Sequence, residues 1–219
     1  MNELGFVPVT LIPTVWIAAA YLLGSIAFGI IVSKLFGLPD PRTVGSGNPG
    51  ATNVLRSGKK LAAALTLLGD VLKGWLPVWL ALRSDMLVES DALMWVVASV
   101  GLAVFFGHLY PIFYKFKGGK GVATALGVML AISPMLGLAA AISWIVVFAI
   151  TRYSSLAAIV AAALAPVYAW FLLPRADNFL GVSDYVITVA VMAVMLIWRH
   201  RSNIQKLLAG TESGFGKKK

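Results

Sequence analysis

GVATALGVMLAISPMLGLAAAISWIVVFAI, residues 121–150, is a run of thirty residues without a charged side chain. Ser133-Pro134 interrupts the run near its middle. Because proline cannot continue the hydrogen-bond ladder of a helix, the run forms either one long kinked helix or two shorter helices joined by a turn. A membrane-spanning helix needs ~20 apolar residues, so the choice changes the number of membrane crossings.

The composition of the whole chain predicts an integral membrane protein. Of its 219 residues, 59% are hydrophobic and 12% are charged, whereas a soluble domain is ~45–50% apolar and ~25% charged. The chain has no cysteine, which excludes disulfides, thiolate nucleophiles and cysteine metal sites. The start Met1-Asn-Glu-Leu lacks the cationic region of a cleavable signal peptide, so we expect the first helix to be retained.

A turn at Ser133-Pro134 gives an all-α polytopic fold of seven transmembrane helices. No internal repeat or domain boundary is visible, so residues 1–219 are expected to form a single domain. The helices are expected near Pro8–Phe36, Leu61–Leu82, Ala92–Phe113, Gly121–Ile132, Met135–Ile150, Ser155–Leu173 and Tyr185–Trp198.

The distribution of positive charge favours the turn over the kinked helix. With a turn, 15 of the 18 Lys and Arg residues fall on one side, in stretches 34–60, 115–120, 152 and 199–219. Only Arg83 and Arg175 fall on the other side, and Lys73 lies within the second helix. This split follows the positive-inside rule and predicts an outside N-terminus and a cytoplasmic C-terminus. Because the net charge of +9 is distributed by loop, it does not indicate a nucleic-acid partner.

Two polar, glycine-rich segments lie on the predicted cytoplasmic side: SGNPGATNVLR, residues 46–56, and GHLYPIFYKFKGGKGVAT, residues 107–124. Between apolar helices, exposed backbone amides are tolerated only where they face protein, water or a ligand. Glycines let successive N–H groups converge on an anion, and Arg56 and Lys120 add positive charge. The pattern indicates phosphate binding, and the alternative is a pair of solvated cytoplasmic turns.

Two familiar phosphate motifs are excluded here. Gly45–Gly50 matches G-x-G-x-x-G, but a membrane helix precedes it, so no βαβ dinucleotide site can form. Gly118-Gly-Lys-Gly121 is not a P-loop, since Gly121 and not Ser or Thr follows Lys120. No metal site and no cofactor is expected.

Several ionisable residues fall inside helices or at their ends. Asp70 and Lys73 share a face of the second helix, where an isolated charge costs a few kcal/mol. They form either a structural ion pair or a unit in which Asp70 orients Arg56 or a loop lysine. His108 and His200 sit at helix ends, where each is either a site residue or an interfacial one.

Five segments taken together resemble a known family. SGNPGATNVLR, GDVLKG, GHLYPIFYKFKGGKGVAT, RYSSL and RHRSNIQKLLAGTESGFG, in this order, are similar to the bacterial acyl-phosphate:glycerol-3-phosphate acyltransferases of the PlsY type. The resemblance implies an inner-membrane enzyme whose active site faces the cytoplasm. It would make lysophosphatidic acid from acyl phosphate and glycerol 3-phosphate, the first acylation step of phospholipid synthesis. Functional coupling to the enzyme that supplies acyl phosphate is a further expectation.

The resemblance also implies site residues. The expected catalytic residues are Ser46, Arg56, Asp70, Lys120 and His200. The expected substrate contacts are Asn48, Gly50, Asn53, His108, Lys117, Gly118, Gly119, Ser154, Ser155, Asn203 and Glu212.

The implied reaction needs no protein nucleophile, because acyl phosphate is a mixed anhydride with a good leaving group. Neither histidine begins an HxxxxD motif, since Phe113 and Gln205 stand where Asp would be. The proton acceptor is the phosphoryl oxygen of the substrate, His200 or His108, and we favour the substrate. A secondary transporter for an anionic solute is the alternative function. It is disfavoured because both polar segments lie on one side and the two halves show no repeat.

Overall fold

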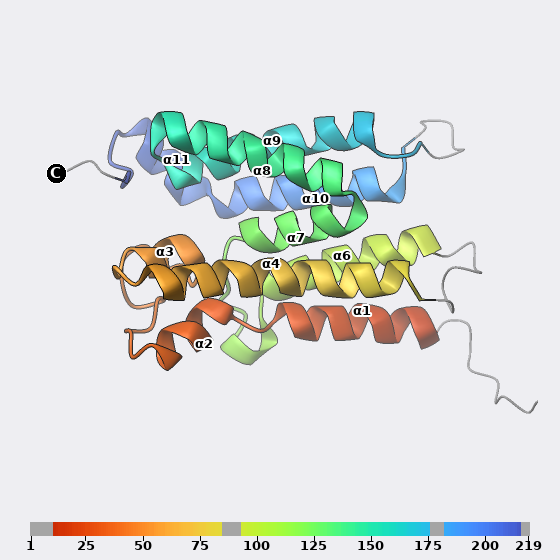
Figure 1. Ribbon diagram of the computed structural model, residues 1–219, viewed down its shortest axis with the longest axis horizontal. Coiled ribbons are helices and arrows are strands. Elements are labelled where there is room, and N and C mark those ends of the chain that lie inside the picture. Colours follow the sequence, from red (N-terminus) through yellow and green to blue (C-terminus); the bar gives the residue numbers. More distant parts are fainter. Residues whose placement is uncertain (1–10, 85–92, 176–181, 216–219) are drawn as a thin grey trace, which may run out of the picture.

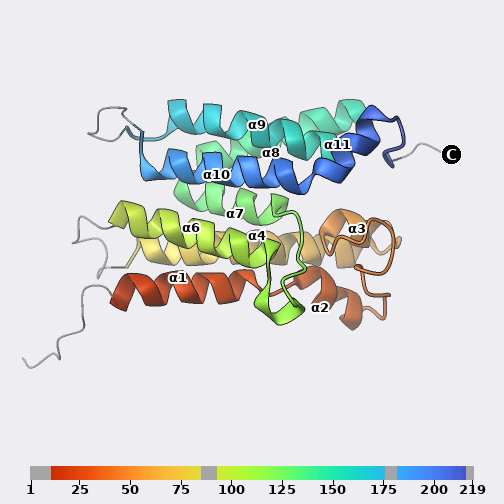
Figure 2. The ribbon, with the colours of Figure 1, turned by 180° about the vertical axis from the view of Figure 1, so that it is seen from behind.

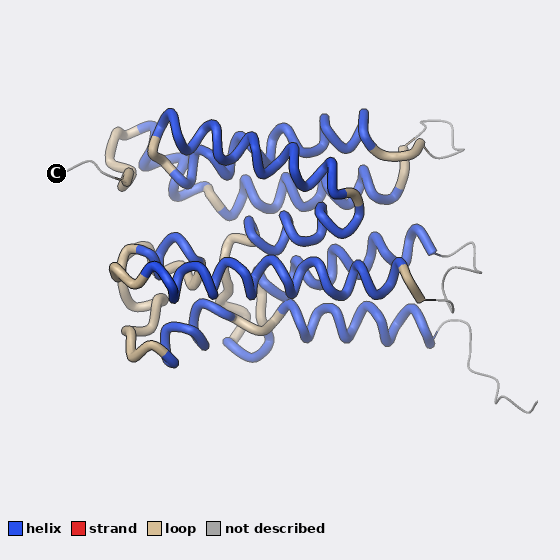
Figure 3. The backbone as a smooth tube through the Cα atoms, viewed as in Figure 1, coloured by secondary structure: helices blue, strands red, loops and turns tan. Residues whose placement is uncertain are grey.

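The computed structural model describes residues 11–84, 93–175 and 182–215, and every regular element in these ranges is a helix (Figure 3). In chain order the elements are α1 (Leu11–Gly24), α2 (Phe28–Leu35), α3 (Ala51–Leu55), α4 (Lys60–Leu82), α6 (Leu93–Leu109), the 3-10 helix η1 (Ile112–Tyr114), α7 (Val122–Ile132), α8 (Pro134–Thr151), α9 (Ser154–Leu172), α10 (Asp184–Arg199) and α11 (Arg201–Leu208).

Within the described ranges, four helical stretches are long and apolar enough to cross a membrane: Lys60–Leu82, Leu93–Tyr114, Pro134–Thr151 and Ser154–Leu172. The bent pair of α1 and α2 makes a fifth if it is counted as one span. α7 has only 11 residues, a length of ~16 Å at 1.5 Å per residue. It is therefore too short to cross a ~30 Å hydrocarbon core by itself.

The helices form two groups with α7 between them (Figures 1 and 2). One group contains α1, α4 and α6, and the other contains α8, α9 and α10. α7 packs against α4 in the first group and α8 in the second. The segments that hold α2, α3 and α11 gather at one end of the molecule. We call it the polar end.

The turn at Ser133-Pro134 is confirmed, since α7 ends at Ile132 and α8 begins at Pro134. Ser133 has an extended backbone, and its hydroxyl accepts a hydrogen bond from the Leu136 amide at 3.4 Å. Proline is favoured at the first position of a helix because its missing N–H would have no partner there. The same residue that stops α7 therefore starts α8.

The expectation of one continuous first helix is wrong. α1 ends at Gly24, α2 begins at Phe28, and their axes differ by 41°. A Cβ at Gly24 would overlap the backbone of Val104 in α6, so α1 and α6 pack at backbone distance. The sequence is apolar on both sides of residues 25–27, so hydrophobicity gave no sign of the break between α1 and α2. Pro8, the expected start, lies outside the described residues.

The third helix also ends earlier than expected. α6 stops at Leu109, before Pro111, and the separate 3-10 helix η1 follows at Ile112–Tyr114. Its expected start, Ala92, lies outside the described residues. The short helices α3 and α11 were not predicted, because five and eight residues carry too little apolar periodicity.

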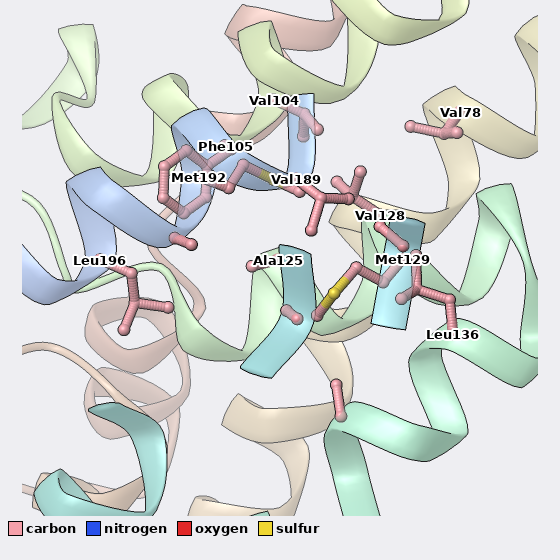
Figure 4. Close-up of a cluster of buried hydrophobic side chains, with 14 of the residues drawn as sticks. Val78, Val104, Phe105, Ala125, Val128, Met129, Leu136, Val189, Met192 and Leu196 are labelled. Carbon is pink, nitrogen blue, oxygen red and sulfur yellow. The ribbon is translucent and has the colours of Figure 1, made fainter. Parts of the chain in front are cut away.

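The core joins α7 to both groups of helices (Figure 4). Val78, Phe105, Val128 and Met192, from four helices, are fully buried. A Cβ at Gly127 would overlap the carbonyl oxygen of Val71, so α4 and α7 approach at backbone distance. This close packing fixes the start of α7, and with it Lys120, beside α4.

Candidate active site

A cavity of about 560 Å³ lies against α7, with walls from α4, α8 and α9. Small and apolar side chains line most of it, among them Ala63, Leu67, Leu126, Met129 and Trp144. Toward the polar end of the molecule its lining changes to polar and charged residues: Ser46, Asn48, Thr52, Asn53, Arg56, Lys120, Ser154, Ser155, His200, Asn203 and Glu212. We call it the amphiphilic cavity, since it suits a ligand with an alkyl chain and an anionic head.

A second cavity of about 290 Å³ adjoins the first and shares Ser46, Asn48 and Lys120 with it. Its other lining residues are Gly47, Gly118, Arg199, Arg201, Ser202 and Gln205. The lining contains three cations and no carboxylate. This basic side cavity therefore suits an anion without an alkyl chain.

A hydrogen-bond network crosses the polar end of the amphiphilic cavity. Lys120 Nζ donates to Asn203 Oδ1 at 2.5 Å, and Asn203 Nδ2 donates to Glu212 Oε1 at 2.8 Å. Ser155 Oγ donates to the same Glu212 oxygen at 2.6 Å. The network joins four of the expected site residues across α9, α11 and the segment before α7. The pKa of Lys120 is lowered to about 8, chiefly by burial: Glu212 opposes the shift, and the nearby cations Arg56 and Arg199 contribute to it.

His200 is buried at the wall of the amphiphilic cavity. Its Nδ1 lies 2.8 Å from the Leu196 carbonyl oxygen. Burial lowers the pKa of His200 to about 4, although the Leu196 hydrogen bond opposes this. The ring is therefore neutral near pH 7. With the proton on Nδ1 donated to Leu196, Nε2 carries the free lone pair.

Asn53 organises the first polar segment from within. Its Oδ1 accepts the Ser46 amide at 3.0 Å, and its Nδ2 donates to the carbonyls of Pro41 at 2.8 Å and Val44 at 3.0 Å. Gly45 takes a left-handed φ of +58° beside it, a conformation that favours glycine. The turn presents Ser46 and Asn48 to both cavities.

Two further contacts tie this segment to distant parts of the chain. Arg56 follows α3, and its Nη2 donates to the Ser213 carbonyl at 3.1 Å. Thr52 Oγ1 lies 3.2 Å from Ser154 Oγ at the start of α9. The polar end of the cavity is thus assembled from three segments that are far apart in the sequence.

Arg199 and His108 hold the second polar segment. Arg199 donates to the Gly118 carbonyl at 3.0 Å and to the Gly119 carbonyl at 2.9 and 3.2 Å. The Gly119 amide donates to the His108 carbonyl at 3.1 Å. A Cβ on Gly118 would overlap that carbonyl oxygen, and one on Gly119 would overlap the His108 ring. Both positions therefore require glycine.

Sequence reasoning missed Arg199: it was counted among the charges that set topology and begins one of the family segments, but it was not named as a site residue. No local pattern marks it as different from Arg201 or Lys206. Its contact with Gly118 and Gly119 joins residues about eighty positions apart and arises only in the folded chain.

Some expected site residues lie apart from the cavities. Lys117 is exposed and lines neither cavity, and Gly119 faces His108 instead. The expected pairing of Asp70 with Lys73 is confirmed at 2.7 Å. Asp70 also lies 3.5 Å from His108 Nδ1, whereas Arg56 bonds to Ser213. Asp70 and His108 reach the wall of the amphiphilic cavity.

Comparison with known proteins agrees with this arrangement. The profile of a family described as glycerol-3-phosphate acyltransferase matches residues 14–210. A glycerol-3-phosphate acyltransferase of Methylobacillus flagellatus is 68% identical over 204 residues, which cover 93% of this chain and 97% of the relative. The chain belongs to this acyltransferase family. A relative of the same name in Burkholderia pseudomallei is 57% identical over 201 residues, covering 92% of this chain and 94% of the relative.

Two crystal structures of PlsY (YgiH), an integral membrane glycerol 3-phosphate acyltransferase, share the fold. The glycerol 3-phosphate form has a TM-score of 0.82 at 42% identity, covering 93% of this chain and 96% of that chain. The lysophosphatidic acid form has a TM-score of 0.80 at 41% identity, with 93% and 95% covered. The resemblance to the PlsY family is confirmed: the protein is a multi-pass membrane acyltransferase of phospholipid biosynthesis, and a transporter is not favoured.

Proposed function

We propose that this protein transfers a fatty acyl group from acyl phosphate to the 1-hydroxyl of sn-glycerol 3-phosphate, giving lysophosphatidic acid and inorganic phosphate. The observation that carries the proposal is the amphiphilic cavity, whose apolar length ends at Arg56 and Lys120. Both substrates carry phosphate, and only the donor and the product carry an alkyl chain. A cavity with an apolar half and a cationic half fits both of these amphiphilic molecules, the donor before the reaction and the product after it.

The acyl chain lies along the apolar lining, and the phosphates meet the cations at the polar end. Arg56 and Lys120, with Ser46, Ser154 and Asn203, supply donors that converge there. In a partly dehydrated site, such donors stabilise negative charge more strongly than water does, and this stabilisation is the largest contribution in many enzymes. Asn53 acts by shaping the turn that presents Ser46.

Acyl transfer proceeds by direct attack. The glycerol oxygen forms a bond to the acyl carbon, the bond from that carbon to the phosphate oxygen breaks, and phosphate leaves. The hydroxyl proton passes to a phosphoryl oxygen of the donor. With a pKa of about 4, His200 is a poor base, whereas a phosphoryl dianion, in the reference case of a phosphate monoester, takes up a proton near pH ~6. A general base works best with a pKa near the operating pH, which favours the substrate.

The charge distribution supports a defined orientation in the bacterial inner membrane. Seven helical passes, with α7 as an incomplete one, leave the N-terminus outside and the C-terminus in the cytoplasm. The basic stretches 34–60, 152 and 199–215 belong to connections at the polar end (Figure 1). The active site then faces the cytoplasm, where coupling to the enzyme that supplies acyl phosphate is feasible.

The donor is tested by a direct comparison. Purified protein in detergent is given glycerol 3-phosphate with acyl phosphate, acyl-CoA or acyl-carrier protein, and lysophosphatidic acid is quantified. Of the three donors, only acyl phosphate is expected to give lysophosphatidic acid. Lys120→Ala, purified in parallel, reports any contaminating enzyme. The proposal would be contradicted if the protein used acyl-CoA at a comparable rate and the Lys120→Ala preparation did not. Solute uptake by reconstituted protein, without acyl transfer, would instead support the transporter.

A further inference from the structure

A buried ion pair lies between the two polar segments. Asp70 and Lys73 of α4 are 2.7 Å apart, and their side chains are 3% and 1% exposed. Burying two charges is costly, and well-packed neutral residues are often as stable in such a place. Stability alone therefore does not explain the pair, and its role lies in the other contacts that Asp70 and Lys73 make.

Lys73 reaches the break between α1 and α2. Its Nζ donates to the Ile26 carbonyl at 2.6 Å, a group that lies where the helical ladder is interrupted. Beyond the break, α2 packs directly on the first polar segment, since a Cβ at Gly29 would overlap the Pro49 carbonyl. Lys73 is thus linked, through the direction of α2, to the position of residues 46–50.

Asp70 reaches the second polar segment through His108. Its Oδ1 lies 3.5 Å from His108 Nδ1, which is also 3.1 Å from Thr124 Oγ1. The other side of the His108 ring lies against Gly119, and the His108 carbonyl accepts the Gly119 amide. Asp70 is thus linked to the segment that carries Lys120.

The two links converge on one place. Pro49 and Gly119, one from each polar segment, line the same void of about 10 Å³ as Asp70, Lys73 and His108. The segment between α6 and α7 lies beside the break between α1 and α2 (Figure 2), and the Ile112 amide is 3.4 Å from Ser25 Oγ.

We infer that Asp70 and Lys73 form a positioning pair: Lys73 fixes the 46–50 segment through the helix break, Asp70 fixes the 118–120 segment through His108, and together they set the separation of the two segments. Asp70, which the sequence suggested as catalytic, acts through other residues. The kinetic part of this inference rests on the proposed function, while the spacing is independent of it.

The test separates geometry from stability. In the double variant Asp70→Asn/Lys73→Met both charges are removed and the volumes are nearly kept, so the thermal midpoint is expected to stay near that of wild type. A misplacement of ~1 Å at a site costs ~100-fold in rate, so kcat/KM should fall by roughly this factor with a raised KM for glycerol 3-phosphate. Thr188→Val is the control: it removes a different buried hydrogen bond, to Ala98, and should leave both constants unchanged.

A distance measurement reads the spacing without any substrate. The chain has no cysteine, so spin labels at Val44→Cys and Phe116→Cys, which are 40% and 56% exposed, report one distance distribution. It should shift or broaden in the double variant and not in Thr188→Val. An unchanged distance distribution in the double variant would overturn the inference, even if the kinetics changed. Asp70 would then be assigned a direct role in the reaction. If the double variant does not fold, Asp70→Asn in the labelled chain is judged by the same criterion.

Discussion

Lys120 is the cation that both cavities share. Truncation in Lys120→Ala would leave a desolvated phosphate unpaired, so kcat/KM should fall about 30-fold, or ~2 kcal/mol of transition-state stabilisation. Lys59→Ala is the matched control, because Lys59 is exposed and lines neither cavity. Equal losses of kcat/KM in the two variants would show that lining a cavity does not distinguish the cations that bind substrate from the other cations.

The lowered pKa of Lys120 predicts a basic limb in the pH profile. Lys120 is charged below its pKa of about 8 and loses its charge as the pH rises through that value. Since kcat/KM reports the free enzyme, it should fall above about pH 8. Lys120→Arg should move this limb upward, because arginine stays protonated to pH ~12. A limb that stays in place in Lys120→Arg would assign it to another group.

The histidines distinguish the possible proton acceptors. His200→Gln and His108→Gln should each retain most of kcat if the donor's phosphoryl oxygen takes the proton, with losses mainly in KM. A true general base contributes ~10²–10⁴-fold to rate, and its removal abolishes a limb of the pH profile. We would measure kcat against pH at saturating substrates for both variants. A drop of that size with one limb lost would name that histidine as the base.

At the scale of elements, close backbone contacts hold the second polar segment. A Cβ at Gly118 would overlap the His108 carbonyl oxygen, a backbone atom that cannot rotate away. Gly118→Ala should therefore displace the segment and lower kcat/KM by at least ~10-fold, since small misplacements at a site are costly. Gly37→Ala is the control, because nothing lies within 4 Å of its Cβ and only its φ of +64° is strained.

The two glycine variants differ in what they should change. The left-handed backbone at Gly37 costs an alanine ~1–2 kcal/mol of stability and leaves the cavities intact. Thermal midpoints and kcat/KM, measured together, separate the two effects. Normal activity in Gly118→Ala would show that the 118–120 segment tolerates displacement.

Broken and shortened helices bring polar backbone to the cavity. α1 and α2 diverge by 41°, and α7 starts only at Val122, after the non-helical stretch that carries Lys120. Non-helical backbone at membrane depth is tolerated where it faces protein or a cavity. Here the non-helical carbonyl groups have hydrogen-bond donors within the protein: Lys73 donates to the Ile26 carbonyl, and Arg199 donates to the carbonyls of Gly118 and Gly119.

For the whole molecule, orientation is testable because the chain has no cysteine. Leu208→Cys, at a position 85% exposed at the polar end, should react with a membrane-impermeant thiol reagent only from the cytoplasmic side. Arg175→Cys, beyond the other end of α9, should react only from outside. Labelling is compared in intact cells and inverted membrane vesicles. The reverse pattern would invert the proposed topology.

The class of the protein and most of its helices could be predicted from the amino-acid sequence. An apolar run that is long enough to cross the membrane has few possible structures, because lipid cannot form hydrogen bonds with the backbone and the segment must satisfy them itself. Proline is equally local in its effect and marked the interruption at Ser133-Pro134, and the distribution of Lys and Arg then favoured a turn over a kinked helix. The long motifs identified the family, and the polar residues in them include Ser46, Arg56 and Lys120, which now lie together.

The construction of the site depends on contacts between distant helices. The break after Gly24 and the early end of α6 depend on packing between helices, and apolar composition does not register packing. Arg199 looked like any cytoplasmic cation until the fold placed it on Gly118 and Gly119. The partners of Asp70 and the two cavities arise from distant segments, and the lining of the amphiphilic cavity runs from Ser46 to Ser213. Such contacts form when helices pack, because short-range sequence patterns carry no information on which distant helix faces which.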